Sequence, residues 1–285
     1  MSPPVIAVLL ATVPASAAGR AGEVIGAAGV HVIAEGESLV ELARRYDVGF
    51  NQIAAANPGL DPFVPPVGAR AVIPTAWILP AAAAPGTLIV NLSEMRLYLL
   101  GARPGPPVTY PVGVSVEAEQ TPLGVLTVIQ KTIDPTWHPT RAIRSEDPSL
   151  PASVPPGEDN PLGSHALRLS IPTILIHGTD RPFGVGRKVT HGCVRLYPED
   201  MAELYRLVRV GTPVRFVREP LKVGVHEGRV LVEAHEDDAA PAPTLAGAVR
   251  LLRARGVVHR VDLRKLREAL GARTGLPVDV TADAR

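Results

Sequence analysis

The chain has 285 residues, of which 46% are apolar, so it is long enough for more than one domain and apolar enough to bury a core. Its 29 basic residues are balanced by 28 acidic ones and form no dense Lys/Arg block. This excludes the electrostatic surface that sequence-independent nucleic-acid binding requires. The 30 prolines and the 4% aromatic content predict a chain rich in loops.

Residues 1–18 resemble a secretory signal peptide. The apolar run Val5–Val13 is followed by the small residues Ala15-Ser16-Ala17, which are typical of a cleavage site, although no basic residue precedes Arg20. The run is shorter than the ~20 residues that span a bilayer. We therefore expect export to the periplasm and no stable membrane span.

Residues 29–75 have the pattern of a small βααβ unit. A β-prone run around His31 is followed by Ser38, a good N-cap, and by Leu39 and Leu42 at helical spacing. A second helix ends before Asn57-Pro58-Gly59, and a closing strand follows.

This unit resembles a LysM module, which implies binding to glycan chains that contain N-acetylglucosamine. The matching residues are His31-Val32, Gly36-Glu37-Ser38-Leu39, Ile53, Asn57 and Val72-Ile73-Pro74.

Residues 86–217 are dominated by short strand-like runs separated by Gly and Pro, which predicts a mainly β domain, a sandwich or a barrel. The predicted strands are Leu88–Asn91, Arg96–Leu100, Val108–Val112, Gly124–Gln130, Ala166–Leu169, Thr173–Ile176 and Pro213–Val217. One helix is expected over Glu199–Val208. The Pro-rich stretch 134–160 has no periodicity, and a loop of that length is usually functional, so we expect a lid.

Residues 218–285 are predicted to form a small α/β subdomain. Two strands, Lys222–Val225 and Arg229–Glu233, precede an Ala/Pro linker, and two helices are expected within Leu245–Arg255 and Asp262–Leu270.

The chain contains one cysteine, Cys193, so an intramolecular disulfide is impossible. A thiol becomes a useful nucleophile when a neighbouring base favours the thiolate over its ordinary pKa of about 8.5. His177 ends an apolar run, and the carbonyl of Gly178 is placed to fix its tautomer. We expect His177 to activate Cys193 as an ion pair, with the backbone around His191 and Gly192 forming the oxyanion region.

These residues resemble the catalytic domain of the L,D-transpeptidases of the YkuD type, and the order of units resembles the enterobacterial ErfK, YbiS, YcfS and YnhG group. The matching blocks are Thr121–Gly124, Asn160–Gly163, His177-Gly178, Arg181–Gly186, Thr190–Leu196 and Tyr197–Asp200. Leu126 departs from the family, which often has an aromatic residue there.

The resemblance implies an enzyme of the peptidoglycan layer that needs no cofactor and no metal. Cys193 would attack the carbonyl between the L-centre of diaminopimelate and D-Ala, releasing D-Ala. An amine of another stem peptide, or of an outer-membrane lipoprotein or barrel protein, would take the acyl group. Arg195 would bind a substrate carboxylate or orient the cysteine loop, and Thr190, Asn160 and Trp137 would contact substrate. The LysM module would then hold the enzyme on the wall and be dispensable for turnover of soluble stem peptides.

Three alternatives remain open at this point. An L,D-carboxypeptidase would use the same acyl-enzyme with water as acceptor, and a non-catalytic protein would only bind the wall. A zinc site would use His165, His177, His191 and Cys193, although their spacing matches no familiar zinc pattern.

Overall fold

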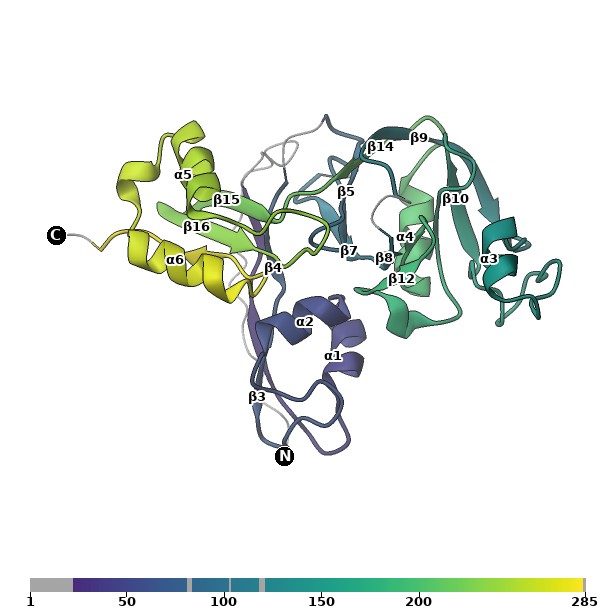
Figure 1. Ribbon diagram of the computed structural model, residues 1–285, viewed down its shortest axis with the longest axis horizontal. Helices are drawn as coiled ribbons and strands as arrows, with labels where there is room; N and C mark the ends of the chain where they lie inside the picture. The colour runs from purple at the N-terminus through teal and green to yellow at the C-terminus, as the bar shows by residue number, and fades with distance from the viewer. Residues whose placement is uncertain (1–22, 81–83, 103, 118–120, 284–285) are drawn as a thin grey trace.

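The computed structural model describes residues 23–80, 84–102, 104–117 and 121–283, so the expected signal peptide lies outside the described residues. The fold is mainly β, as predicted, and its described part contains six α-helices. Three units are visible in Figure 1: an N-terminal module at the bottom, a large central domain on the right and a C-terminal subdomain on the left. No helix in these ranges is both long and apolar enough to cross a membrane.

The N-terminal module is the predicted βααβ unit. Strand β2 (Gly29–Val32) pairs antiparallel with β3 (Arg70–Ile73), and helices α1 (Leu39–Arg45) and α2 (Phe50–Ala56) lie between them in sequence. Ser38 caps α1 as expected: its hydroxyl accepts from the backbone N–H of Glu41, whose carboxylate accepts from the N–H of Ser38. A second pair, β1 (Val24–Gly26) with β4 (Ala76–Ile78), extends the module toward the rest of the molecule.

The central domain contains a curled eight-stranded sheet in the order β13-β11-β10-β9-β14-β5-β6-β7. Helix α4 (Pro198–Leu207) packs on it, and its Met201 and Leu204 join the main apolar core. The strands are β5 (Leu88–Asn91), β6 (Arg96–Leu99), β7 (Val108–Pro111), β9 (Gly124–Ile133), β10 (His165–Leu169), β11 (Leu175–His177), β13 (Val194–Arg195) and β14 (Pro213–Val217).

Short parallel pairings place the cysteine loop. Strand β12 (Lys188–Thr190) pairs with β8 (Val114–Ser115), and β13 pairs with β11 so that Arg195 lies beside His177. Cys193 lies between β12 and β13, so the pairings bring it to the edge of the sheet where β11 ends. The expected lid includes an unpredicted short helix, α3 (Arg141–Glu146), and a bridge between Trp137 and Val154.

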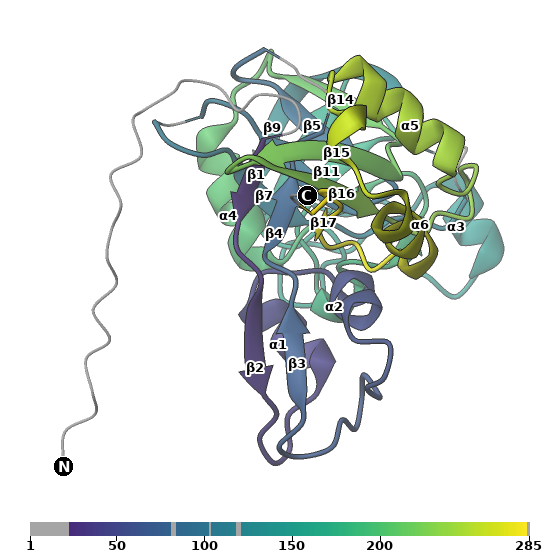
Figure 2. The same cartoon turned by 90° about the vertical axis from the view of Figure 1, so that its left-hand side faces the viewer.

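The C-terminal subdomain has its own core. Its sheet, β15 (Leu221–His226), β16 (Arg229–Ala234) and β17 (Val278–Asp279), is covered by α5 (Leu245–Ala254) and α6 (Leu263–Ala272). Figure 2 shows α5 above and α6 below the strands β15 and β16, as in Figure 1.

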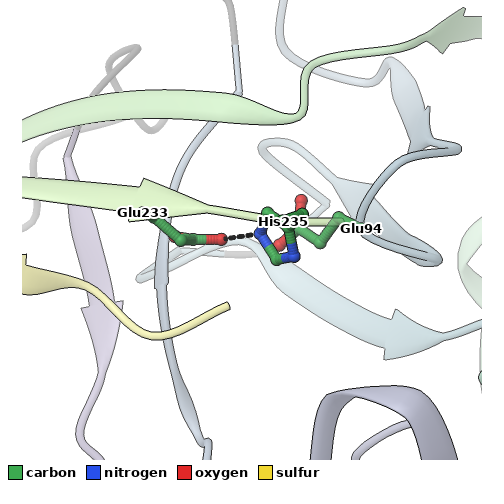
Figure 3. Close-up of side chains that lie close together, drawn as sticks. All are labelled: Glu94, Glu233 and His235. Atoms are coloured by element: carbon green, nitrogen blue, oxygen red, sulfur yellow. Dashed lines mark hydrogen bonds and ion pairs between the residues drawn. The ribbon is translucent and has the colours of Figure 1, made fainter. Parts of the chain in front are cut away.

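A buried polar cluster joins all three units. Glu94 follows β5, Glu233 and His235 come from the end of β16, and these side chains converge in Figure 3. The Lys222 ammonium lies 2.9 Å from Glu94 and 2.7 Å from Glu233, and Glu233 also accepts from the N–H of Ile78 in β4. The lysine supplies the positive charge that these carboxylates need, so the cluster is a structural junction and not a metal centre.

The N-terminal module is built into the central domain. The N–H groups of Phe50 and Asn51, in the first turn of α2, donate to the carbonyls of Val185 and Gly186 at 3.3 and 3.1 Å. Residues of the module share one apolar core with Ile89, Tyr98 and Leu100 of the central sheet. The two units therefore form a continuous body.

Candidate active site

Cys193 and His177 line the same cavity, of about 720 Å³, beneath the lid. His177 is the last residue of β11, is 4% exposed, and its ring nitrogen Nδ1 lies 2.6 Å from the carbonyl oxygen of Gly178. This is the contact expected from the sequence. Because a carbonyl only accepts, Nδ1 carries the proton and Nε2 is left as the acceptor.

The imidazole of His177 is neutral at physiological pH. Burial, reinforced by the positive charge of Arg195, lowers its pKa from 6.5 to about 4, although the Gly178 carbonyl opposes the shift. A base with this pKa is deprotonated and ready to accept a proton over the whole neutral range.

The thiol of Cys193 is also neutral. Burial raises its pKa above the ordinary value, while the backbone N–H of Leu175 and the charges of Arg195 and Arg168 act in the opposite direction. The thiol lies 3.5 Å from the carbonyl oxygen of Thr173, to which it donates. The resting site therefore holds a thiol and an imidazole, and not the thiolate–imidazolium pair that we expected from the sequence.

Charged groups of both signs line the cavity around this pair. Arg195 is half-buried on β13. The other charged residues of the lining are Glu146, Asp147, Asp159, Arg168, Asp180 and Arg181, of which only Arg181 stood in a block matched from the sequence. A cavity with fixed cations and carboxylates is suited to a peptide that itself carries carboxylates and an amine.

The backbone of the cysteine loop departs from the expected oxyanion region. Gly192 has a φ of +99°, a conformation that favours glycine. Its N–H donates to the Ser115 hydroxyl at 3.2 Å and so does not face the cavity. The N–H of Cys193 is left as the candidate donor to an oxyanion.

His191 and Trp137 both line the cavity. The His191 side chain is 41% exposed, and its Nε2 lies 3.5 Å from the Glu146 carboxylate on α3. It therefore connects the lid to the cysteine loop at the rim. Trp137 is half-buried in the lid.

Two of the residues expected to contact substrate have other roles. Asn160 is buried, and its amide donates to the carbonyls of Pro135 and Pro155 and accepts from Leu162 N–H, so it holds the ends of the lid together and does not line the cavity. Thr190 does line the cavity, but its hydroxyl donates to the carbonyl of Cys193 at 2.6 Å.

The alternative zinc site is not assembled. His165 lies against Tyr205 and contacts the Ser164 hydroxyl. In the described part of the chain, the group of side chains close enough to share a metal is the Glu94 cluster, which includes neither Cys193 nor His177.

Comparison with known proteins agrees with this geometry. Residues 85–216 match the model of the L,D-transpeptidase catalytic domain, YkuD, and residues 31–74 match that of the LysM domain. The chain is 37% identical over 268 residues to "Probable L,D-transpeptidase YcfS" of Escherichia coli K12, covering 88% of this chain and 82% of that protein. It is 35% identical over 272 residues to "Probable L,D-transpeptidase YbiS" of the same strain, covering 89% and 87%.

Among solved structures, the chain is similar to the catalytic domain of an L,D-transpeptidase from E. faecium, with 25% identity and a TM-score of 0.35 over 46% of this chain and 95% of that one. The assignment rests on the sequence relatives, which cover most of both chains. The chain belongs to the L,D-transpeptidase family, with a catalytic domain of the YkuD type preceded by a LysM domain.

Proposed function

We propose that this protein is an exported cysteine L,D-transpeptidase that acts on peptidoglycan stem peptides through an acyl-enzyme on Cys193. The observation that carries the proposal is the sharing of one cavity by the single thiol and a neutral histidine with a free Nε2. A nucleophile with a base in reach is the arrangement that covalent acyl transfer requires.

The reaction has two balanced steps. The thiol of Cys193 gives its proton to Nε2 of His177 while sulfur bonds to the carbonyl carbon at the L-centre of diaminopimelate. The bond to D-Ala then breaks, and the imidazolium returns the proton to the departing amine. In the second step an acceptor amine attacks the thioester, loses a proton to His177, and the cysteine leaves as a thiol.

The mixed charge of the cavity supports a stem peptide as the acyl donor. Arg195, Arg168 and Arg181 offer donors for its carboxylates, and Asp180 offers an acceptor for an ammonium group. The acceptor amine belongs either to another stem, which gives a 3–3 crosslink, or to an envelope lipoprotein or barrel protein, which is thereby attached to the wall.

The LysM domain supports a location at the cell wall. Modules of this kind bind glycan, and a wall substrate together with the signal-like residues 1–18 supports a periplasmic location.

The test is product analysis with a tetrapeptide stem and an amine acceptor. Wild-type protein is expected to release D-Ala and form the new amide, with a thioester adduct at Cys193 detected by mass spectrometry. Cys193→Ala is expected to lose both products while keeping the melting temperature and sacculus binding of the parent. Turnover by folded Cys193→Ala would contradict the nucleophile, and a tripeptide product without the new amide would show an L,D-carboxypeptidase.

A further inference from the structure

Three buried hydroxyls surround the backbone of the cysteine loop. Ser115 on β8 accepts from the N–H of Gly192 at 3.2 Å and donates to the carbonyl of Thr190 at 3.2 Å. Thr121, just before β9, donates to the carbonyl of Gly192 at 3.0 Å, and Thr190 donates to the carbonyl of Cys193. Each of the three residues is at most 5% exposed. The polar groups on both sides of the Gly192–Cys193 peptide are thus held by side chains.

The bond from Thr121 sets the direction of the Cys193 N–H. A trans peptide is planar, so the Gly192 carbonyl and the Cys193 N–H point in opposite directions. Thr121 and Ser115 line a separate cavity of about 290 Å³ that includes neither Cys193 nor His177. With its carbonyl turned toward that side, the peptide turns the Cys193 N–H toward the catalytic cavity, which Cys193 and His177 line.

The Cys193 N–H is also available. No acceptor contacts it anywhere in the part of the chain that the structure describes. Gly192 N–H, by contrast, is already bonded to Ser115. An unpaired N–H beside the nucleophile is the group that an oxyanion needs.

Gly192 cannot keep this orientation by itself. Its φ of +99° requires glycine, but glycine also permits many other conformations, so the peptide that follows it is free to rotate unless its polar groups are bonded. We propose that Ser115 and Thr121 are positioning residues that fix the Gly192–Cys193 peptide so that the Cys193 N–H binds the oxyanion of the acyl-transfer step. This inference rests on the proposed function, because it assigns the oxyanion donor of that reaction.

The experiment compares two reactions of the same thiol. Acyl transfer from a stem peptide builds an oxyanion, whereas alkylation by iodoacetamide displaces iodide and builds none. Thr121→Val removes the hydroxyl with little change of shape, Thr121→Ser keeps it, and Ser115→Ala removes the second contact. Thr75→Val is the control, because the Thr75 hydroxyl also donates to a backbone carbonyl, that of Ala27 at 2.7 Å, in the N-terminal module and away from the cysteine loop.

For Thr121→Val and Ser115→Ala we expect kcat to fall about 10- to 100-fold, with KM little changed. This is less than the ~10²- to 10³-fold loss in kcat that follows removal of an entire oxyanion donor, because the Cys193 N–H remains and is only less well oriented. Alkylation should stay within about twofold of wild type, and Thr121→Ser should recover most of kcat. Equal losses in acyl transfer and alkylation would overturn the inference, since they indicate a disordered loop. An unchanged kcat in Thr121→Val would also overturn the inference. The proposed function would still stand in that case, provided that turnover by the wild-type enzyme depends on Cys193.

Discussion

His177 and Cys193 carry no charge in the resting site because His177 is buried and Cys193 is half-buried in the same cavity. Burial disfavours the charged form of either group, and Arg195 adds a positive charge that further opposes protonation of the imidazole. The sequence motif suggested an ion pair because it identifies the two residues, whereas their burial, which disfavours charge, is known only from the structure. In the proposed mechanism His177 is therefore a general base during attack and not the counter-ion of a preformed thiolate.

The first prediction concerns this base. With a His177 pKa of about 4, kcat/KM should stay level from neutral pH down to about pH 5 and fall as the imidazole becomes protonated near pH 4. His177→Asn should lower kcat/KM by about 10²- to 10⁴-fold and remove that acid limb.

Alkylation of wild-type Cys193 by iodoacetamide measures the thiol directly. Its pH midpoint should lie above the ordinary thiol value of about 8.5, because partial burial disfavours the thiolate and raises the pKa. A midpoint well below that value would show a preformed thiolate and contradict the neutral pair.

The sequence identified Cys193 and His177, which line one cavity, and missed Ser115, which holds the backbone of the cysteine loop. Cys193, His177 and Gly178 were predicted from residue type and spacing. Asn160 was assigned to substrate binding from its place in a motif, but its hydrogen bonds close the lid internally. Ser115 had no signal in the sequence, because its contact with Gly192 joins residues 77 positions apart.

At the element scale, helix α4 and the turn after α1 meet through two acidic side chains. Asp200, in the first turn of α4, lies beside Asp47 of the LysM domain, and two partly buried carboxyls this close do not both ionise, so one keeps its proton. Burial, the neighbouring Asp47 and Glu199 raise the pKa of Asp200 to about 9, and burial also raises that of Asp47, whereas Arg96 opposes both shifts. The contact between the two domains therefore depends on one retained proton.

The second prediction follows from the sign of this shift. Between the ordinary carboxyl pKa and about 9 the folded protein holds a proton that the unfolded chain has lost, so the free energy of unfolding falls as pH rises through this window. Asp200→Asn cannot ionise but can still donate to Asp47. Its melting temperature should equal that of wild type at about pH 4 and below, and exceed it increasingly toward pH 9, by about 2–4 °C per kcal/mol.

The control for this variant is Glu268→Gln, which removes an exposed carboxylate that pairs with Arg264 on α6. Exposed pairs are worth about 0–1 kcal/mol, so its melting profile should follow that of wild type. A difference between Asp200→Asn and wild type that does not change with pH would show that Asp200 is ionised in the folded protein.

Elements with an internal pattern were predictable, and elements created by pairing were not. Leu88–Asn91 and Pro213–Val217 are mostly apolar runs of ordinary strand length, and the structure places strands there with the expected bounds. Strands β8 and β13 have two residues each, too short for any periodicity. They exist because distant segments meet at the edge of the sheet, and these are the strands that position Cys193.

At the scale of the whole molecule, the LysM domain is part of the catalytic body. We expected it to be dispensable for turnover of soluble peptides, but it shares an apolar core with β5 and β6 and is bonded to Val185–Gly186. That segment leads through β12 to His191 and Cys193. Removing the domain would expose Ile89, Tyr98 and Leu100. A truncated enzyme would therefore lose stability as well as wall binding, and the two effects could not be told apart.

The last prediction tests this contact between the LysM domain and the catalytic domain by adding one methyl group. Gly49 and Gly186 meet backbone to backbone: a Cβ on Gly49 would lie 2.8 Å from the Cα of Gly186. Gly49→Ala must therefore push α2 away from the segment, at a cost of about 1–3 kcal/mol typical of overpacking. Gly59→Ala is the control, since its Cβ would meet nothing within 4 Å.

We expect Gly49→Ala to lower both the melting temperature and kcat on a soluble stem peptide, because the displaced segment carries the cysteine loop with it, while Gly59→Ala changes neither. Glycan binding to sacculi should be kept by Gly49→Ala, because the interior of the module is untouched. A variant that melts lower but turns over at the wild-type rate at low temperature would show that the contact stabilises the fold without positioning Cys193.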